Sequence, residues 1–162
     1  MWEQLRQAEL FGGLSAGKIQ RLAALGRTRA LRAGEYLFLL GDSAQYISVV
    51  AKGQVDLCFP ISIGGVVRDI SVETVGAGRT VGWSALVKPF RFTLSARAAG
   101  PTEVIAFARD GLQAEIDGDP EIGRVVLAGI AELMAARLAM FQALWARELQ
   151  RTLESGRPVA ER

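Results

Sequence analysis

The stretch "RAGEYLFLLGDSAQYISVVAKGQVDL", residues 32–57, carries the pattern that decides the fold. Short runs of β-branched, aromatic and leucine residues alternate with turns at Gly34, Gly41 and Gly53. Turn residues that interrupt apolar runs every ~8–12 positions are typical of antiparallel sandwiches and barrels. The same texture continues to residue 109, so we expect an antiparallel β-roll over residues 27–109.

Helical patterns flank this region on both sides. Before it, "SAGKIQRLAALG" places Ile19 and Leu22 on one face, with Ser15 at the expected N-cap. After it, Asp119 and Pro120 are typical of a helix start. The predicted fold class is α+β, mainly β, with a jelly-roll-like β-roll between N-terminal helices and a long C-terminal helix. The predicted segments are N-terminal helices over 1–26, the roll over 27–109, C-terminal helices over 110–154 including a long one over about 120–153, and a frayed tail over 155–162.

The long C-terminal helix is the part of the chain that predicts oligomerisation. About thirty residues of helix are roughly 45 Å long, which is more than a domain of this size can cover. Its apolar stripe continues along that length, so we expect a homodimer through this helix. The alternative is that the helix folds back over the roll. The expected interface residues are Leu127, Ile130, Met134, Leu138, Phe141 and Trp145.

Composition excludes several kinds of chemistry. The 162 residues include no histidine and one cysteine, Cys58, so histidine catalysis, histidine-ligated metals and an internal disulfide are ruled out. No carboxylate dyad stands out, and we expect neither an enzyme nor a metal site. A net charge of +2 without a basic cluster does not indicate nucleic acid. Glu132 and Arg137 interrupt the longest apolar run, so we expect a cytoplasmic protein without membrane contact.

Several segments together resemble the cyclic nucleotide-binding domain family, as in the effector domains of Crp/Fnr regulators. Residues 32–57 are similar to its first strands, and "VGAGRTVGWSALV" is similar to the entry into its phosphate-binding cassette. "SARAAGPTEVIAF" and "DPEIGRVVLAGIAELMAARL" resemble the later strands and the closing helices. The resemblance implies a β-roll with a cassette at 78–94 and a regulatory role. Many members add a helix-turn-helix, for which we expect no room here, and hence no DNA binding by this chain.

The cassette departs from the family pattern, which is roughly Gly-Glu-x-x-Leu followed by Pro-Arg-Ser/Thr-Ala. In that pattern the glutamate accepts from the ribose hydroxyl and the arginine pairs with the phosphate. Here Trp83 takes the glutamate position and Phe92 the arginine position, while Arg91 lies one residue early. The Gly-Trp-Ser start and the aromatic-Arg-aromatic segment resemble a subgroup of the family. The candidate ligand-contacting residues are Gly82, Trp83, Ser84, Ala85, Arg91, Phe92 and Thr93.

Two functions follow from these departures. Losing both contacts is expected to weaken cyclic AMP binding by about two to four decades. The first function is a non-enzymatic sensor domain that holds a cyclic nucleotide or another small anionic effector. The second is a ligand-free dimeric scaffold whose pocket is filled by Trp83. Arg91 fits a solvated surface charge as well as an anion ligand, and a partner protein fits either function.

Overall fold

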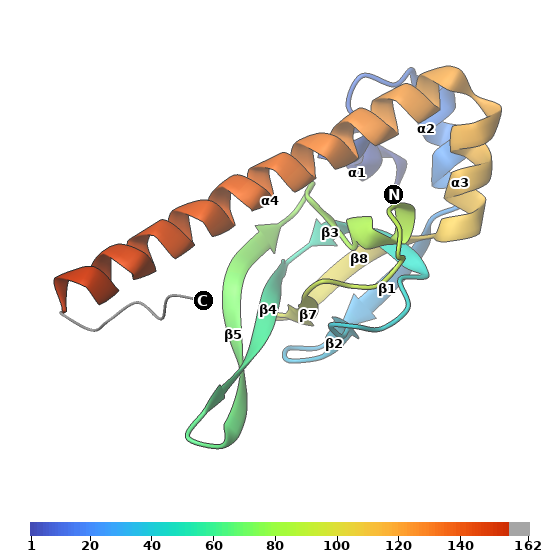
Figure 1. The fold of residues 1–162 in the computed structure, drawn as a ribbon. Helices are drawn as coiled ribbons and strands as arrows, with labels where there is room; N and C mark the ends of the chain where they lie inside the picture. Colours follow the sequence, from blue (N-terminus) through green and yellow to red (C-terminus); the bar gives the residue numbers. More distant parts are fainter. Residues whose placement is uncertain (156–162) are drawn as a thin grey trace. The chain divides into compact units, whose positions relative to one another are not determined.

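The computed structural model describes residues 1–155 (Figure 1). Residues 156–162, most of the expected tail, lie outside the described residues. The chain divides into two compact units, residues 1–126 and the residues from 127 onward.

The N-terminal segment is three short pieces. These are α1 (Trp2–Arg6), the 3-10 turn η1 (Glu9–Phe11) and α2 (Ala16–Ala23). Their apolar residues, including Leu5, Phe11 and Leu22, are buried. Ser15 precedes α2 as expected, but its side chain makes no capping hydrogen bond to a described residue. The helical segment is therefore confirmed, whereas the capping role of the Ser15 hydroxyl is not found.

The roll consists of two four-stranded antiparallel sheets, ordered β1-β8-β3-β6 and β2-β7-β4-β5. This arrangement confirms the predicted fold class. Within residues 1–155 the strands are β1 (Arg27–Leu31), β2 (Tyr36–Phe38), β3 (Tyr46–Lys52), β4 (Gln54–Ile63), β5 (Val66–Gly76), β6 (Thr80–Val81), β7 (Ser95–Ala98) and β8 (Thr102–Ala108).

Strand alternation divides the first sheet into two faces. Val49 pairs with Ile105, and Ile47 with Phe107, so these four side chains share one face. The Phe107 ring contacts Phe11 of η1 edge-on, with the ring centroids 5.4 Å apart, so this face packs on the N-terminal segment. The alternate residues, Tyr46 and Ser48 on β3 and their partners on β8 and β1, face the other way. Arg27, Tyr46 and Ala108 are exposed, so this end of the second face is open to solvent.

Gly53 makes the tight turn between β3 and β4. Its φ is 78°, and a Cβ there would lie 2.5 Å from the carbonyl oxygen of Pro101. A side chain at this position would collide with backbone, so the turn predicted from the Lys-Gly pattern requires glycine.

Two helices follow the roll, α3 (Arg109–Gly118) and α4 (Pro120–Glu154). Asp119 caps α4 as predicted, because its Oδ1 accepts from the backbone N–H groups of Glu121 at 3.0 Å and Ile122 at 3.2 Å. The same carboxylate accepts from Lys18 Nζ at 2.7 Å and from Arg21 Nη2 at 3.2 Å. Contact with Lys18 and these backbone donors lowers the pKa of Asp119 to about 2. Asp119 thereby ties α2 to the first turn of α4.

The second unit holds most of α4. Its apolar side chains include exposed Leu127, Met134, Leu138, Leu144 and Trp145. Glu132 and Arg137, which were expected to interrupt the apolar run, both lie in α4. An 18-residue window of α4 has a mean hydropathy of 1.6 with no more than two charged residues, which meets the length and hydropathy of a membrane span. Core helices of soluble proteins meet the same requirement, so this observation is weak evidence.

Candidate functional site

The predicted cassette begins where β6 ends. Gly82 has a φ of 82° and leads into the 3-10 turn η2 (Trp83–Leu86). A Cβ on Gly82 would lie 3.0 Å from the carbonyl oxygen of Tyr46 and within 3.4 Å of the Phe92 and Phe38 rings. Both the backbone conformation and the close packing therefore require glycine at this corner.

The first residues of the turn are packed into the protein. Ser84 and Ala85 are buried, with 4% and 0% of their surface exposed, and Trp83 is half-buried. The indole of Trp83 is a hydrogen-bond donor only. It therefore cannot replace the carboxylate that accepts from a ribose hydroxyl in the family pattern.

In the next part of the cassette, Phe92 is buried and Arg91 is exposed. Phe92 is 7% exposed, and its ring stacks on Phe38 with centroids 3.7 Å apart and planes 8° from parallel. Arg91 is exposed, and its Nη1 donates to the carbonyl oxygen of Gly41 at 2.8 Å. Thr93 is exposed. The aromatic ring at the family's arginine position is thus the side chain that enters the protein, and Arg91 pairs with a surface loop.

The segment around Phe90 is a turn and not part of a strand. Phe90 has a φ of 58°, and its ring lies under the Arg109 guanidinium, 4.9 Å from ring centroid to Cζ. Arg91 forms only an isolated bridge with Ser43, and β7 begins at Ser95. The backbone turns at Phe90 because it hydrogen-bonds locally, from the Phe90 N–H to the Val87 carbonyl oxygen at 2.9 Å.

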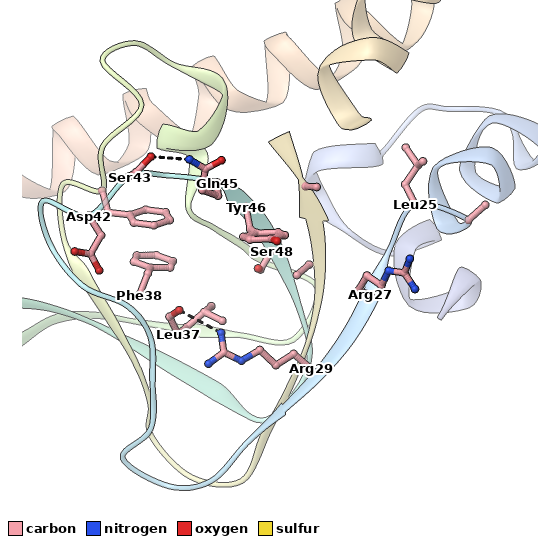
Figure 2. Close-up of a pocket in the computed structure, with 14 residues that line it drawn as sticks. Leu25, Arg27, Arg29, Leu37, Phe38, Asp42, Ser43, Gln45, Tyr46 and Ser48 are labelled. Carbon is pink, nitrogen blue, oxygen red and sulfur yellow. Dashed lines mark hydrogen bonds between the residues drawn. The ribbon is translucent and has the colours of Figure 1, made fainter. Parts of the chain in front are cut away.

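A cavity of about 820 Å³ lies within the first unit, beside Phe92 (Figure 2). Residues of both sheets line it, so we call it the inter-sheet cavity. Of the seven predicted site residues, Phe92 alone is among the described residues that line it. Its lining is Ala24, Leu25, Arg27, Arg29, Leu37, Phe38, Asp42, Ser43, Gln45, Tyr46, Ser48, Phe92, Ala106 and Ala108.

Strand register explains why this cavity exists. Ala106 on the central strand β8 pairs with Arg27 of β1 on one side and with Ser48 of β3 on the other. Ala108 pairs with Tyr46 on the same face. The small side chains of β8 leave space between the long side chains of β1 and the Tyr46 ring. The stacked Phe38 and Phe92 rings line the cavity as well.

Charge in the inter-sheet cavity is unevenly distributed. Arg29 donates to the carbonyl oxygens of Tyr36 at 3.3 Å and Leu37 at 3.4 Å. Within the described chain, no hydrogen bond or ion pair is recorded for Arg27, which is exposed. Asp42 is the single acidic residue in the lining, and Figure 2 shows it on the opposite side of the cavity from Arg27. The β1 side of the cavity is therefore positive.

Sequence reasoning missed Arg27 and Arg29. Their signal was present, because two arginines at i and i+2 of an expected strand share one face. The sequence did not show which strand lies beside β1. That strand is β8, which carries the small residues Ala106 and Ala108 at the same spacing of two. Cys58 is buried and free, and burial raises the pKa of its thiol. Within residues 1–155 no group of three or more Cys, Asp or Glu side chains is placed to hold a metal ion.

Comparison with known proteins identifies the family to which this fold belongs. The model of the family described as "Cyclic nucleotide-binding domain" matches residues 28–119, more than half of the chain. The cyclic AMP receptor protein of Thermus thermophilus is 29% identical over 134 residues, which cover 83% of this chain and 59% of that protein. A second curated relative, from Rhodopseudomonas palustris, is 26% identical over 125 residues, 77% of this chain. The chain spans only 29% of that relative's length.

Solved structures agree with the family match. A cyclic nucleotide-binding domain from Methylobacillus flagellatus has a TM-score of 0.73 at 25% identity, over 93% of this chain and 82% of that one. The catabolite activator protein of Thermus thermophilus has a TM-score of 0.69 at 28% identity, over 89% of this chain and 63% of that one. With the two-sheet roll, the glycine corner at Gly82 and the match over residues 28–119, the chain belongs to the cyclic nucleotide-binding domain family.

Proposed function

We propose that this chain is a non-enzymatic regulatory domain whose cassette does not hold cyclic AMP by the family's usual contacts. One observation carries the proposal: Phe92, at the arginine position, is buried against Phe38, while Arg91 pairs with the Gly41 carbonyl. A charge-assisted hydrogen bond to phosphate contributes about 1.5–3 kcal/mol, and a buried ring supplies none of it. The donor-only indole of Trp83 supports the same conclusion for the ribose.

A calorimetric titration with cyclic AMP tests this proposal. We expect the wild-type chain to bind about two to four decades more weakly than a Trp83→Glu/Phe92→Arg variant, which restores both family contacts. Phe59→Arg, at an exposed position on β4, is the control for an added positive charge.

Because Phe92→Arg removes a buried ring, Trp83→Glu alone provides a second measurement at a half-buried position. It should gain roughly tenfold or more in affinity from the restored hydroxyl acceptor. Micromolar binding of cyclic AMP by the wild type, unchanged in both variants, would show that the proposal is wrong.

A dimeric interaction scaffold is the second candidate function. It is supported by the exposed apolar side chains of α4, among them Leu138 and Trp145, which a second copy of the helix or a partner protein would cover. In this function Trp83 is expected to fill the cassette pocket, and its half-buried indole fits that role. The inter-sheet cavity, whose described lining does not include Trp83, does not distinguish the scaffold from the sensor.

The cellular setting is part of the proposal. The free, buried thiol of Cys58 fits a reducing compartment, so we infer a cytoplasmic location. The net charge of +2 and the scattered arginines give no basic face for DNA, so we infer that this chain acts through its ligand or a protein partner.

A further inference from the structure

We propose that the inter-sheet cavity binds a small aromatic molecule that carries one anionic group. The biological role of such a ligand rests on the regulatory function proposed above. Whether the cavity binds the ligand does not depend on that function. The site lies beside the cassette rather than in it, because Gly82, Trp83, Ser84 and Ala85 are not among the described residues that line the cavity.

Size and lining are those of a small-molecule site. A volume of about 820 Å³ falls in the range of roughly 300–1,000 Å³ that is usual for ligand pockets. Eight of the fourteen lining residues are apolar or aromatic. The others are the neutral polar residues Ser43, Gln45 and Ser48 and the charged residues Arg27, Arg29 and Asp42. This composition orients a ligand through few hydrogen bonds and binds it mainly through apolar contact.

Aromatic surface is available on two sides of the cavity. The stacked pair of Phe38 and Phe92 is held rigidly, with the rings nearly parallel. Tyr46 is 54% exposed, whereas residues 47–51 of β3 are buried, so its ring is accessible to cover a bound ring. Offset stacking on such rings contributes about 0.5–1.5 kcal/mol beyond burial, which favours an aromatic ligand over an aliphatic one.

The arginines specify the charge of the ligand. Arg27 and Arg29 alternate along β1 and both line the cavity. Arg29 makes only two long hydrogen bonds to backbone carbonyls, and no partner of Arg27 is recorded among residues 1–155. Guanidinium groups with free donors bind planar carboxylates and phosphates through paired hydrogen bonds.

The position of Asp42 limits the anion to one end. Asp42 lies across the cavity from Arg27 (Figure 2), so a second anionic group there would be repelled. The neighbouring Ser43 and Gln45 are hydrogen-bonded to each other at 2.8 Å and present neutral polar groups. A ligand with an anionic end toward β1 and an uncharged polar or aromatic end toward residues 42–45 fits this distribution.

Fluorescence titration with 1-anilinonaphthalene-8-sulfonate tests the inference on the whole chain. This probe has aromatic rings and one sulfonate, and its neutral parent N-phenyl-1-naphthylamine has the rings alone. We expect saturable binding of the sulfonate. Arg27→Gln/Arg29→Gln should weaken its binding roughly ten- to a hundredfold while changing binding of the neutral parent little.

Arg32→Gln/Arg68→Gln is the matched control, because it removes the same charge at exposed positions outside the lining. Equal losses in the two double variants would mean that only net charge matters, and this outcome would overturn the proposed site.

Two variants test whether the probe occupies the cavity. Ala106→Phe and Ala108→Trp each place a large ring in the space left by β8, and both should abolish binding of both probes. Ala108 is exposed, so its variant should fold even if Ala106→Phe does not. Probe bound instead on the exposed apolar side chains of α4 would survive both changes, and that result would contradict the inference.

The two proposals fail separately. If the probes do not bind in the cavity, the cyclic AMP titration of the cassette variants still tests the proposed function. Cyclic AMP is itself an aromatic molecule with one anionic group, so its binding is also measured in Arg27→Gln/Arg29→Gln. Tight binding that this variant keeps would overturn the proposal for the cassette, whereas tight binding that this variant loses belongs to the cavity.

Discussion

Arg91 and Phe92 are neighbours in the chain, but only the side chain of Phe92 is buried. Phe92 is buried on Phe38, and its exposed neighbour Arg91 bonds to the Gly41 carbonyl. The resemblance to the family pattern assigns Phe92 to the arginine position, and this assignment stays a prediction. The sequence could not show that the Phe92 ring stacks on Phe38, because Phe38 lies more than fifty residues earlier.

Phe92→Ala should therefore destabilise the protein much more than Arg91→Ala. Removing a buried phenylalanine ring costs about 3–5 kcal/mol, and the lower end applies here because Phe92 borders the inter-sheet cavity. Loss of the exposed Arg91 hydrogen bond should cost about 0.5–1.5 kcal/mol. Urea unfolding of the two variants measures both free energies. A larger loss for Arg91→Ala would show that the stacked rings contribute little.

At the scale of the elements, periodicity and glycine spacing were enough to predict the roll and the flanking helices. The Asp-Pro pattern also predicted the start of α4 correctly. The capping hydrogen bond predicted for the Ser15 hydroxyl is not found among the described residues. Helix periodicity places Ser15 at the start of α2, but it does not specify the rotamer that would direct the hydroxyl at the backbone.

The Asp119 clamp predicts a pH dependence of stability. The pKa of Asp119 is about 2 in the folded chain, below the value of about 3.9 for an unperturbed aspartate. Because the folded pKa is depressed, its stabilising contribution is present above about pH 4 and is lost as the pH falls toward 2.

Thermal unfolding of wild type and Asp119→Asn between pH 6 and pH 2 measures this effect. We expect the wild-type midpoint to approach that of the variant as the pH falls. Asp110→Asn, an exposed carboxylate at the start of α3, is the control for removing one acidic group. A constant difference between wild type and Asp119→Asn across this range would rule out the clamp as the cause.

At the scale of the whole molecule, the inter-sheet cavity lay beyond reach of the sequence. It needs β1, β8 and β3 side by side, and the chain reaches β8 only after seven other strands. The exposed residues predicted for a dimer, Leu127, Met134, Leu138 and Trp145, are exposed in the structure. Phe141 is half-buried and Ile130 is buried, and the dimer itself stays a prediction.

Sedimentation velocity tests the dimer with a Phe141→Glu/Trp145→Glu variant. Two carboxylates on the apolar stripe of α4 should convert a wild-type dimer to monomer, because charge cannot be buried between helices without a partner. Gln142→Glu/Ala146→Glu adds the same charge at exposed positions next to the stripe and should remain dimeric. A monomeric wild type would show that the prediction is wrong.

The pairing of β1 with β8 has a consequence for how the protein is made. Arg27 pairs with Ala106, and Lys18 bonds to Asp119, 101 residues later. During synthesis the first strand and α2 therefore leave the ribosome long before their partners exist. Native contacts of such long range slow folding. Until β8 has been made, the two arginines of β1 thus belong to an unpaired segment.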